Sequence, residues 1–327
     1  MKKEKMMRKH MQERIEEMTT LSLNPPLPAC LNIEVNNTCN HECVFCPYHG
    51  KYAPRKLKPA VLEIDFVKEL LVQAANLGIG RKELGFYIAG EPLLYDGMVE
   101  LVQYSKSLGF PYVFMTTNGS MATPEKMKQL IDAGLDSIRF SVNAPDRERY
   151  KEIHGRDDFD KVVGNIKNMR KYLDDNNLDI ATSLSCVITK KTIGIQKQMK
   201  DIFSPYVDDI MFIPVILKRL NNIKEVKEKY EIINDDDLII NPDFKCAMLF
   251  NTMYINAYGK TMPCCEAYDD EIFFYDLKKN PDLKKAWESE EYKRYRKIFV
   301  DGESDAGTLC EHCILRVKAS KRLMMED

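Results

Sequence analysis

The stretch "LNIEVNNTCNHECVFCP" (residues 31–47) joins a short apolar, β-rich run to a loop that holds Cys39, Cys43 and Cys46. Thiolates at such close spacing bind zinc, copper(I) or an iron–sulfur cluster. An ordinary structural zinc and an ordinary iron–sulfur cluster both take four protein ligands. The triad therefore indicates either a fourth ligand from elsewhere, such as His41 or His49, or a metal position that is left open.

Further short apolar runs follow this first strand, with helix-like segments between them. We expect strands over 31–35, 84–89, 112–117, 137–142, 180–188 and 209–215, and helices over 62–77, 97–108, 123–133, 159–176 and 194–203. Strands that alternate with helices of this length predict βαβ units and a parallel sheet. Six such repeats favour a partial (β/α)6 TIM-like barrel within the α/β class. A doubly wound nucleotide-binding sheet is less favoured, because no glycine-rich fingerprint follows the first strand.

The composition is that of an ordinary globular protein, with 327 residues, 44% hydrophobic and 30% charged, and a formal net charge of -2. This charge gives no reason to expect nucleic acid or an anionic membrane as a partner. The N-terminal segment has no signal-peptide core, and no apolar run approaches the length of a membrane span. We therefore expect a cytoplasmic protein. In that reducing compartment its ten cysteines point to metal binding or catalysis rather than to disulfides.

The pattern changes after the sixth repeat. We expect a charged helical extension over 1–28, the barrel over 29–216, a connecting segment over 217–245 and a small C-terminal domain over 246–327. That domain contains a hairpin that turns at Tyr258-Gly259, followed by helices. It is expected to have little core of its own and to be held together by a metal.

The motifs of the barrel resemble those of the radical S-adenosylmethionine (SAM) enzyme superfamily. The cysteine triad, with the aromatic Phe45 before its last member, is similar to the family's CX3CX2C signature. In the expected order, "AGEP" (89–92) resembles the GGEP motif, "TTNG" (116–119) ends the third strand, and "FSVNAPDRERYKEIHG" (140–155) resembles the fourth-strand segment. The likeness covers most of residues 31–215.

The resemblance implies that the triad holds a [4Fe-4S] cluster whose open iron is chelated by SAM. Reduction would then cleave SAM to methionine and a 5′-deoxyadenosyl radical, which abstracts hydrogen from a substrate. The family's SAM-binding residues would correspond here to Phe45, Gly90, Glu91, Pro92, Asn118, Ser141 and Asn143, with Glu91 accepting from the methionyl ammonium. A zinc site completed by His41 or His49 stays the alternative.

The C-terminal cysteines resemble the opening of the SPASM and twitch auxiliary-cluster domains. Twelve residues separate Cys246 from Gly259, and four more lead to Cys264, while Cys310 and Cys313 form a CxxC pair. The resemblance implies that these four thiolates hold one auxiliary [4Fe-4S] cluster, with an all-thiolate zinc site as the alternative. The neighbouring Cys265 could replace Cys264, lie buried, or act as a working thiol.

The reaction itself stays open at this point. The resemblance implies dehydrogenation or epimerisation of a small polar substrate, such as a sugar or aminocyclitol, with Cys186 or Cys265 as candidate catalytic thiols. About 30 residues precede the first strand, fewer than the leader-peptide-binding domain of peptide maturases needs, so peptide modification ranks second. A low-potential flavodoxin or ferredoxin would donate the electron, and neither nucleic acid nor membrane is expected as a partner. A non-catalytic, zinc-stapled binding protein is the alternative from another class.

Overall fold

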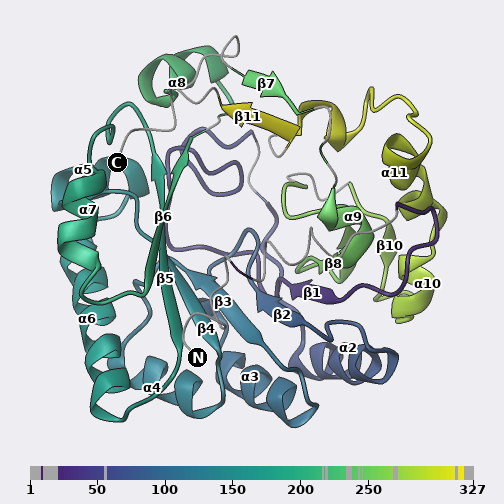
Figure 1. The fold of residues 1–327 in the computed structure, drawn as a ribbon, viewed down its shortest axis with the longest axis horizontal. Coiled ribbons are helices and arrows are strands. Elements are labelled where there is room, and N and C mark those ends of the chain that lie inside the picture. Colours follow the sequence, from purple (N-terminus) through teal and green to yellow (C-terminus); the bar gives the residue numbers. More distant parts are fainter. Residues whose placement is uncertain are drawn as a thin grey trace.

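The computed structural model describes the chain at residue 9 and over 21–54, 57–215, 217, 220–232, 238–241, 244, 246–267, 272–313 and 316–319. All six expected strands are present: β1 (Cys30–Ile33), β2 (Glu83–Phe86), β3 (Val113–Thr117), β4 (Ser137–Ser141), β5 (Ala181–Ile188) and β6 (Asp209–Pro214). Each pairs in parallel with the next (Figure 1). Among the described strands β6 does not return to β1. The predicted partial barrel is therefore confirmed.

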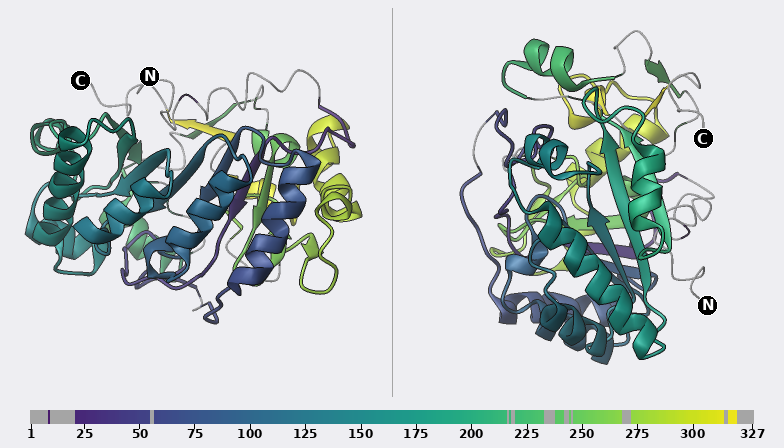
Figure 2. Two further views of the ribbon diagram at one scale, coloured as in Figure 1. Left: turned by 90° about the horizontal axis from the view of Figure 1, so that it is seen from below. Right: turned by 90° about the vertical axis from the view of Figure 1, so that its left-hand side faces the viewer.

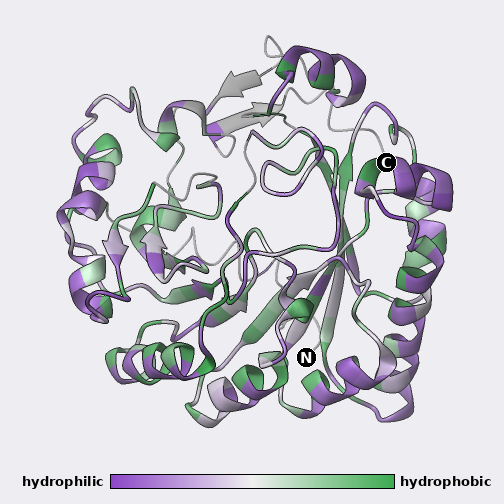
Figure 3. Ribbon diagram, turned by 180° about the vertical axis from the view of Figure 1, so that it is seen from behind, coloured by the Kyte–Doolittle hydropathy of each residue, from purple (hydrophilic) through white to green (hydrophobic). Residues whose placement is uncertain are grey.

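The outer side of the curved sheet is covered by helices, as Figures 1 and 2 show. The five expected helices are α2 (Ile64–Leu77), α3 (Met98–Ser107), α4 (Pro124–Asp132), α6 (Phe159–Asp175) and α7 (Gln196–Phe203). Figure 3 shows largely hydrophobic central strands and hydrophilic residues along the outward turns of these helices. This is the pattern that burial of one helix face against a sheet requires.

Local signals explain where these elements begin and end. The Oγ1 atom of Thr123 accepts a hydrogen bond from the backbone N–H of Lys126 at 3.3 Å, and Pro124 opens the first turn of α4. Helix α5 (Arg147–His154) was not expected as a separate helix, because its sequence is short and mostly charged. It is capped by Asp146 and ends at Gly155, whose φ of +69° favours glycine.

The C-terminal domain extends the barrel's own sheet. Strand β8 (Thr252–Ile255) pairs in parallel with β1, and β9 (Lys260–Met262) and β10 (Tyr275–Asp276) continue the sheet outward. The hairpin between β8 and β9 is as predicted, with Gly259 at a φ of +77°. The remaining described elements are α8 (Ile223–Tyr230), β7 (Leu238–Ile240), α9 (Ala247–Asn251), α10 (Leu283–Trp287), α11 (Glu290–Val300), the 3-10 turn η4 (Leu309–His312) and β11 (Val317–Ala319).

The hydrophobic core is continuous between the two parts, so the C-terminal domain shares the core of the barrel and does not build a separate one. Met253, Tyr254 and Trp287 belong to the same buried cluster as Leu31 and Ile33 of β1. The physical reason is the pairing of β8 with β1, which lets the barrel supply the apolar partners that the short C-terminal segment lacks. A metal is therefore not needed to provide this domain with a core.

Parts of the expected organisation lie outside the described residues. These are most of the N-terminal extension over 1–28, part of the connecting segment over 217–245, and the chain beyond residue 319. Within the described ranges, no helix combines the length and the apolar character that crossing a bilayer would take.

Candidate active site

The three cysteines of the first loop lie directly after β1, at the carboxyl end of the parallel strands, where α/β barrels build their active sites. The backbone N–H of Cys46 donates to the carbonyl of Cys43 at 2.9 Å, and that of Gly50 donates to the carbonyl of Cys46 at 3.1 Å. A Cβ at position 50 would lie 2.4 Å and 2.5 Å from these two carbonyl oxygens. The loop therefore coils tightly around its sulfur atoms and requires glycine at position 50.

The surroundings of the three sulfur atoms suit the binding of a positively charged metal group. The backbone N–H groups of His41 and His49 donate to the Sγ atoms of Cys39 and Cys46, each at 3.4 Å. Burial, together with the nearby Glu91 carboxylate and Cys46, raises the pKa of Cys39 to about 12, and burial raises the pKa of Cys43 well above its usual range. Crowded, buried thiols of this kind ionise when a metal replaces their protons. The donor set fits an iron–sulfur cluster.

The "AGEP" segment lies against the start of this loop. A Cβ on Gly90 would lie 2.2 Å from the carbonyl oxygen of Asn36, so only glycine allows this approach. The backbone N–H of Glu91 donates to the carbonyl of Thr38 at 2.7 Å. Pro92 opens the short 3-10 helix η2 (Pro92–Leu94). The motif therefore presents Glu91 next to the cysteine loop.

The carboxylate of Glu91 is buried and held in one orientation. It accepts from the Thr117 hydroxyl at 2.6 Å, from the backbone N–H of Leu93 at 3.0 Å and from that of Asn118 at 2.7 Å. Burial raises its pKa above the ordinary value, although these hydrogen bonds oppose the shift. A buried carboxylate of this kind is suited to receive a cationic group.

The other residues assigned to SAM occupy different surroundings. Asn118 lies beside the triad, with its amide nitrogen 4.0 Å from the sulfur of Cys39 and 2.8 Å from the side-chain oxygen of Asn40. Ser141 ends β4 and is half-buried. Phe45 packs against a small apolar cluster that includes Val44. The structure thus brings the side chain of Asn118 next to Cys39.

Asn143 belongs to a buried network beneath the triad. Its side-chain oxygen accepts from the backbone N–H of Val187 at 2.7 Å, and its backbone N–H donates to Nε2 of His154 at 3.1 Å. His154 lies 3.6 Å from the sulfur of Cys43 and 3.3 Å from Nδ1 of His41. The side-chain oxygen and the backbone N–H of Asn143 therefore both form hydrogen bonds within the protein.

His41 does not offer a spare nitrogen for zinc. Its Nε2 atom lies 3.1 Å from Oδ2 of Asp158, and its Nδ1 atom faces His154. Burial lowers the pKa values of both imidazoles, that of His154 most strongly. One possible ligand atom from each of His41, Cys43 and His154 lies within 4.8 Å of the others, but both nitrogens of His41 are engaged in the contacts just described.

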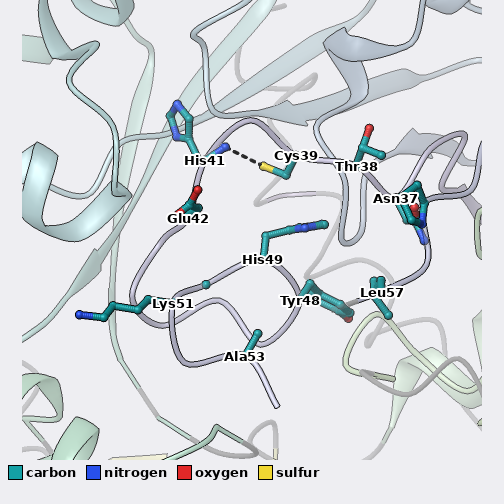
Figure 4. Close-up of a pocket in the computed structure, with 12 residues that line it drawn as sticks. Asn37, Thr38, Cys39, His41, Glu42, Tyr48, His49, Lys51, Ala53 and Leu57 are labelled. Atoms are coloured by element: carbon teal, nitrogen blue, oxygen red, sulfur yellow. Dashed lines mark hydrogen bonds between the residues drawn. The ribbon is translucent and has the colours of Figure 1, made fainter. Parts of the chain in front are cut away.

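A cavity of about 420 Å³ borders the cysteine loop. Figure 4 shows Cys39 and His49 on its inner side, while Lys51 points away. The Nε2 atom of His49 is buried and has no hydrogen-bond partner among the described residues. Tyr48 and Leu57 close another side of the cavity. Its volume is in the range of small-molecule sites.

The four C-terminal cysteines assigned to an auxiliary cluster gather in one place. Burial raises the pKa of Cys246 to about 12, and the proximity of Cys310 and Cys313 adds to this shift. Cys246 in turn raises the pKa of Cys264, after the larger effects of burial and of Cys265. The same reasoning as for the first loop applies, so this donor set also fits a thiolate-bound metal group.

Tyr48 connects the two cysteine groups. It lies two residues beyond Cys46, and its hydroxyl donates to the backbone carbonyl of Cys265 at 2.9 Å. Its side chain is almost completely buried. The loop that follows β1 and the loop that follows β9 are therefore in direct contact.

Cys186 lies in the hydrophobic core. It alternates along β5 with half-buried residues, as do the buried Leu184 and Ile188, so these three side chains share one face. Its side chain is completely buried within the main core cluster. This placement does not favour contact with a substrate.

Glu34 accepts hydrogen bonds from both domains and was not singled out in the sequence. Its carboxylate accepts from the backbone N–H groups of Ala89 at 2.7 Å and Gly90 at 3.2 Å, and from that of Ala257 in the β8–β9 turn at 3.0 Å. Burial raises its pKa to about 7. The available signal was a carboxylate inside an apolar run, "LNIEV". Tyr48, His154 and Asp158 gave no comparable signal.

Comparison with known families agrees with this geometry. The family described as the radical SAM superfamily matches residues 33–192, and the iron–sulfur cluster-binding domain SPASM matches residues 246–314.

Curated relatives match part of the chain. A "Probable GTP 3′,8-cyclase" of Saccharolobus islandicus is 36% identical over 138 residues, which is 42% of this chain and 42% of the relative. An uncharacterised protein of Methanocaldococcus jannaschii is 33% identical over 143 residues, 43% of this chain and 44% of the relative. The chain thus spans less than half the length of the curated relatives that it matches.

Solved structures resemble the chain over most of its length. Against BtrN in complex with AdoMet and 2-DOIA, the TM-score is 0.54 at 16% identity, covering 89% of this chain and 94% of that one. Against SuiB of Streptococcus suis bound to the precursor peptide SuiA, it is 0.63 at 15% identity, covering 88% and 71%. At these identities the likeness shows the fold alone.

Proposed function

The chain belongs to the radical SAM superfamily and carries a SPASM iron–sulfur cluster-binding domain, and on that premise we propose that it oxidises a small polar substrate by dehydrogenation. In this proposal Cys39, Cys43 and Cys46 hold the [4Fe-4S] cluster that binds SAM. The C-terminal cysteines, Cys246, Cys264, Cys310 and Cys313, hold one auxiliary [4Fe-4S] cluster.

When bound, these groups supply a 5′-deoxyadenosyl radical that removes hydrogen from the substrate and a second cluster able to accept an electron. The protein's own residues provide position and exclude water. Glu91 is proposed to hold the ammonium of SAM, because its buried carboxylate is already oriented by Thr117, Leu93 and Asn118. Gly90 lets this segment lie directly on the cysteine loop.

The observation that carries the proposal is the contact between Tyr48 and the carbonyl of Cys265. It supports a site in which the SAM-binding loop and the auxiliary cysteines border one reaction space, as an oxidation that removes a second electron needs. Epimerisation needs a thiol beside the substrate, and the burial of Cys186 does not favour that role. Cys265 stays the candidate thiol for such a reaction.

A second candidate function is the modification of a purine nucleotide. It is favoured by the 36% identity, over 138 residues, to a protein named as a probable GTP 3′,8-cyclase. Modification of a peptide is a third outcome that the substrate test below would reveal. The proposal includes a cytoplasmic location and a low-potential flavodoxin or ferredoxin as electron donor.

Anaerobic purification tests the proposal at the level of the cofactors. We expect a brown protein with about eight irons per chain, for two [4Fe-4S] clusters, that forms 5′-deoxyadenosine from SAM and a reductant. A colourless protein that holds zinc and does not cleave SAM would contradict it and support the binding protein instead.

Product analysis then identifies the reaction. Sugars, aminocyclitols, GTP and candidate peptides are incubated with the loaded enzyme in deuterated water. A ketone or aldehyde product is the expected result. Solvent deuterium at a substrate carbon would indicate epimerisation by return of hydrogen from a thiol, and a cyclised nucleotide or a changed peptide mass would indicate the other candidates.

A further inference from the structure

The main chain of the first cysteine loop is fastened to the end of α5 on both sides of Cys43. The backbone N–H of Glu42 donates to the carbonyl of His154 at 3.0 Å, and that of Val44 donates to the carbonyl of Ile153 at 2.9 Å. A Cβ on Gly155 would lie 3.0 Å from the Cβ of Glu42, which is a close approach. The position of Cys43 relative to His154 is therefore fixed by the backbone.

The ring of His154 is fixed as well. It is completely buried, and it stacks on the ring of Tyr150 with centroids 4.0 Å apart and planes 13° from parallel. Its Nε2 atom faces two donors, the backbone N–H of Asn143 at 3.1 Å and the amide nitrogen of Asn143 at 3.2 Å. The Asn143 amide is oriented this way because its oxygen accepts from Val187.

These contacts assign the ring protons. Since Nε2 of His154 accepts, the neutral ring carries its proton on Nδ1. His41 has the opposite tautomer, because its Nε2 must donate to the carboxylate of Asp158 at 3.1 Å, which leaves its Nδ1 as an acceptor. The 3.3 Å separation of the two Nδ1 atoms agrees with one donor and one acceptor.

We propose that His154 is a positioning residue whose Nδ1–H donates a hydrogen bond to the sulfur of Cys43 and thereby raises the reduction potential of the cluster held there. The Nδ1–H group lies between two acceptors, Nδ1 of His41 and the sulfur of Cys43 at 3.6 Å. A metal-bound thiolate is charged and attracts this proton more strongly than a neutral imidazole does.

Hydrogen bonds to cluster sulfur atoms are among the factors that set iron–sulfur potentials. The reduced cluster carries one more electron, so a donor that draws negative charge from the sulfur stabilises the reduced state. The effect makes reduction, the step on which SAM cleavage depends, easier. This inference rests on the proposed function, because it takes Cys43 as a cluster ligand.

The test compares two variants of His154 in the full-length, loaded protein. His154→Phe keeps a ring to stack on Tyr150 but removes the donor, whereas His154→Asn keeps an N–H close to the position of Nδ1. The readout is the midpoint potential of the cluster whose electron paramagnetic resonance signal changes when SAM is added. Gly164→Ala in α6 is the control for a change remote from the cluster, since its added Cβ meets nothing within 4 Å.

We expect His154→Phe to lower the equilibrium constant for reduction at least tenfold, which is about 59 mV for one electron. His154→Asn should recover most of this loss, and Gly164→Ala should leave the potential unchanged. An unchanged potential in His154→Phe, with the cluster fully loaded, overturns the inference.

A second measurement applies if His154→Phe does not hold a cluster. In the wild-type protein labelled with ¹⁵N at histidine Nδ1, the reduced cluster should show a ¹⁵N hyperfine coupling that His49→Phe retains. The absence of this coupling would overturn the inference. If no cluster signal responds to SAM in any form of the protein, the proposed function itself fails.

Discussion

An alanine at position 50 is expected to weaken assembly of the SAM-binding cluster. Its Cβ would lie 2.4 Å from the carbonyl oxygen of Cys43 and 2.5 Å from that of Cys46, whereas real Cβ contacts stay above 3.0 Å. Both oxygens belong to the backbone and already accept hydrogen bonds within the loop. The loop must therefore open by about 0.6 Å, which exceeds the roughly 0.2 Å tolerance of metal–ligand distances.

The energetic cost of such overpacking is about 1–3 kcal/mol, and a factor of ten corresponds to about 1.4 kcal/mol. We therefore expect Gly50→Ala to bind its first cluster roughly 5- to 150-fold more weakly, while the auxiliary cluster stays loaded. Iron should fall from about eight toward about four per chain, and formation of 5′-deoxyadenosine should fall with the occupancy of the first cluster.

The matched control is Gly164→Ala in α6, where an added Cβ meets nothing within 4 Å. This variant should load iron as the wild-type protein does and gain up to about 1 kcal/mol of helix stability. A Gly50→Ala protein with full iron content and normal SAM cleavage would refute the packing argument for the loop.

Two further predictions concern the buried carboxylates. Glu91→Gln should weaken SAM binding, as measured by calorimetry, by about 10- to 150-fold, the equivalent of about 1.5–3 kcal/mol for a charged hydrogen bond. Because burial raises the pKa of Glu91, the affinity of the wild-type protein for SAM should also fall as the pH is lowered. The affinity of the variant should not change with pH in this way. For Glu34, burial raises the pKa from 4.5 to about 7, so the folded protein binds the proton more tightly than the unfolded chain does. The free energy of unfolding should then decrease by about 3 kcal/mol as the pH rises from about 4.5 to about 7, and urea titrations of Glu34→Gln should lack this slope; an equal slope in both proteins would show that Glu34 does not cause it.

The barrel could be predicted because its signals are local. The alternation of apolar runs and capped helices fixes the βα order, and the Thr123-Pro124 start of α4 was visible in the sequence. The ends of the strands differ from the expected ones by a few residues, since β2 ends at Phe86 and not at residue 89. The cysteine spacing was equally local, and family comparison confirmed the superfamily that it indicated.

The joining of the two domains could not be predicted in the same way. Strand β8 pairs with β1 although more than 200 residues separate them, and no local pattern specifies such a partner. The same applies to Glu34, whose three backbone donors come from two distant turns. Hydrogen bonds of this kind depend on the completed fold.

The residues that surround Cys43 could not be predicted from the sequence either. His154 belongs to a helix that the apolar pattern did not reveal, and its neighbours His41 and Asp158 come from two other loops. From the sequence, His41 was a candidate zinc ligand. The structure gives both of its nitrogens to Asp158 and His154 instead, so its role is to support the site from within the protein.

The central claim is that the first loop holds the cluster that cleaves SAM and that the C-terminal cysteines hold a separate one. Its most direct test is 5′-deoxyadenosine formation by Cys43→Ala and Cys313→Ala, each measured with SAM and a reductant alongside the iron content. We predict that Cys43→Ala abolishes SAM cleavage, whereas Cys313→Ala retains cleavage but loses the oxidised product. Reductive SAM cleavage by Cys43→Ala at the wild-type rate would contradict the account.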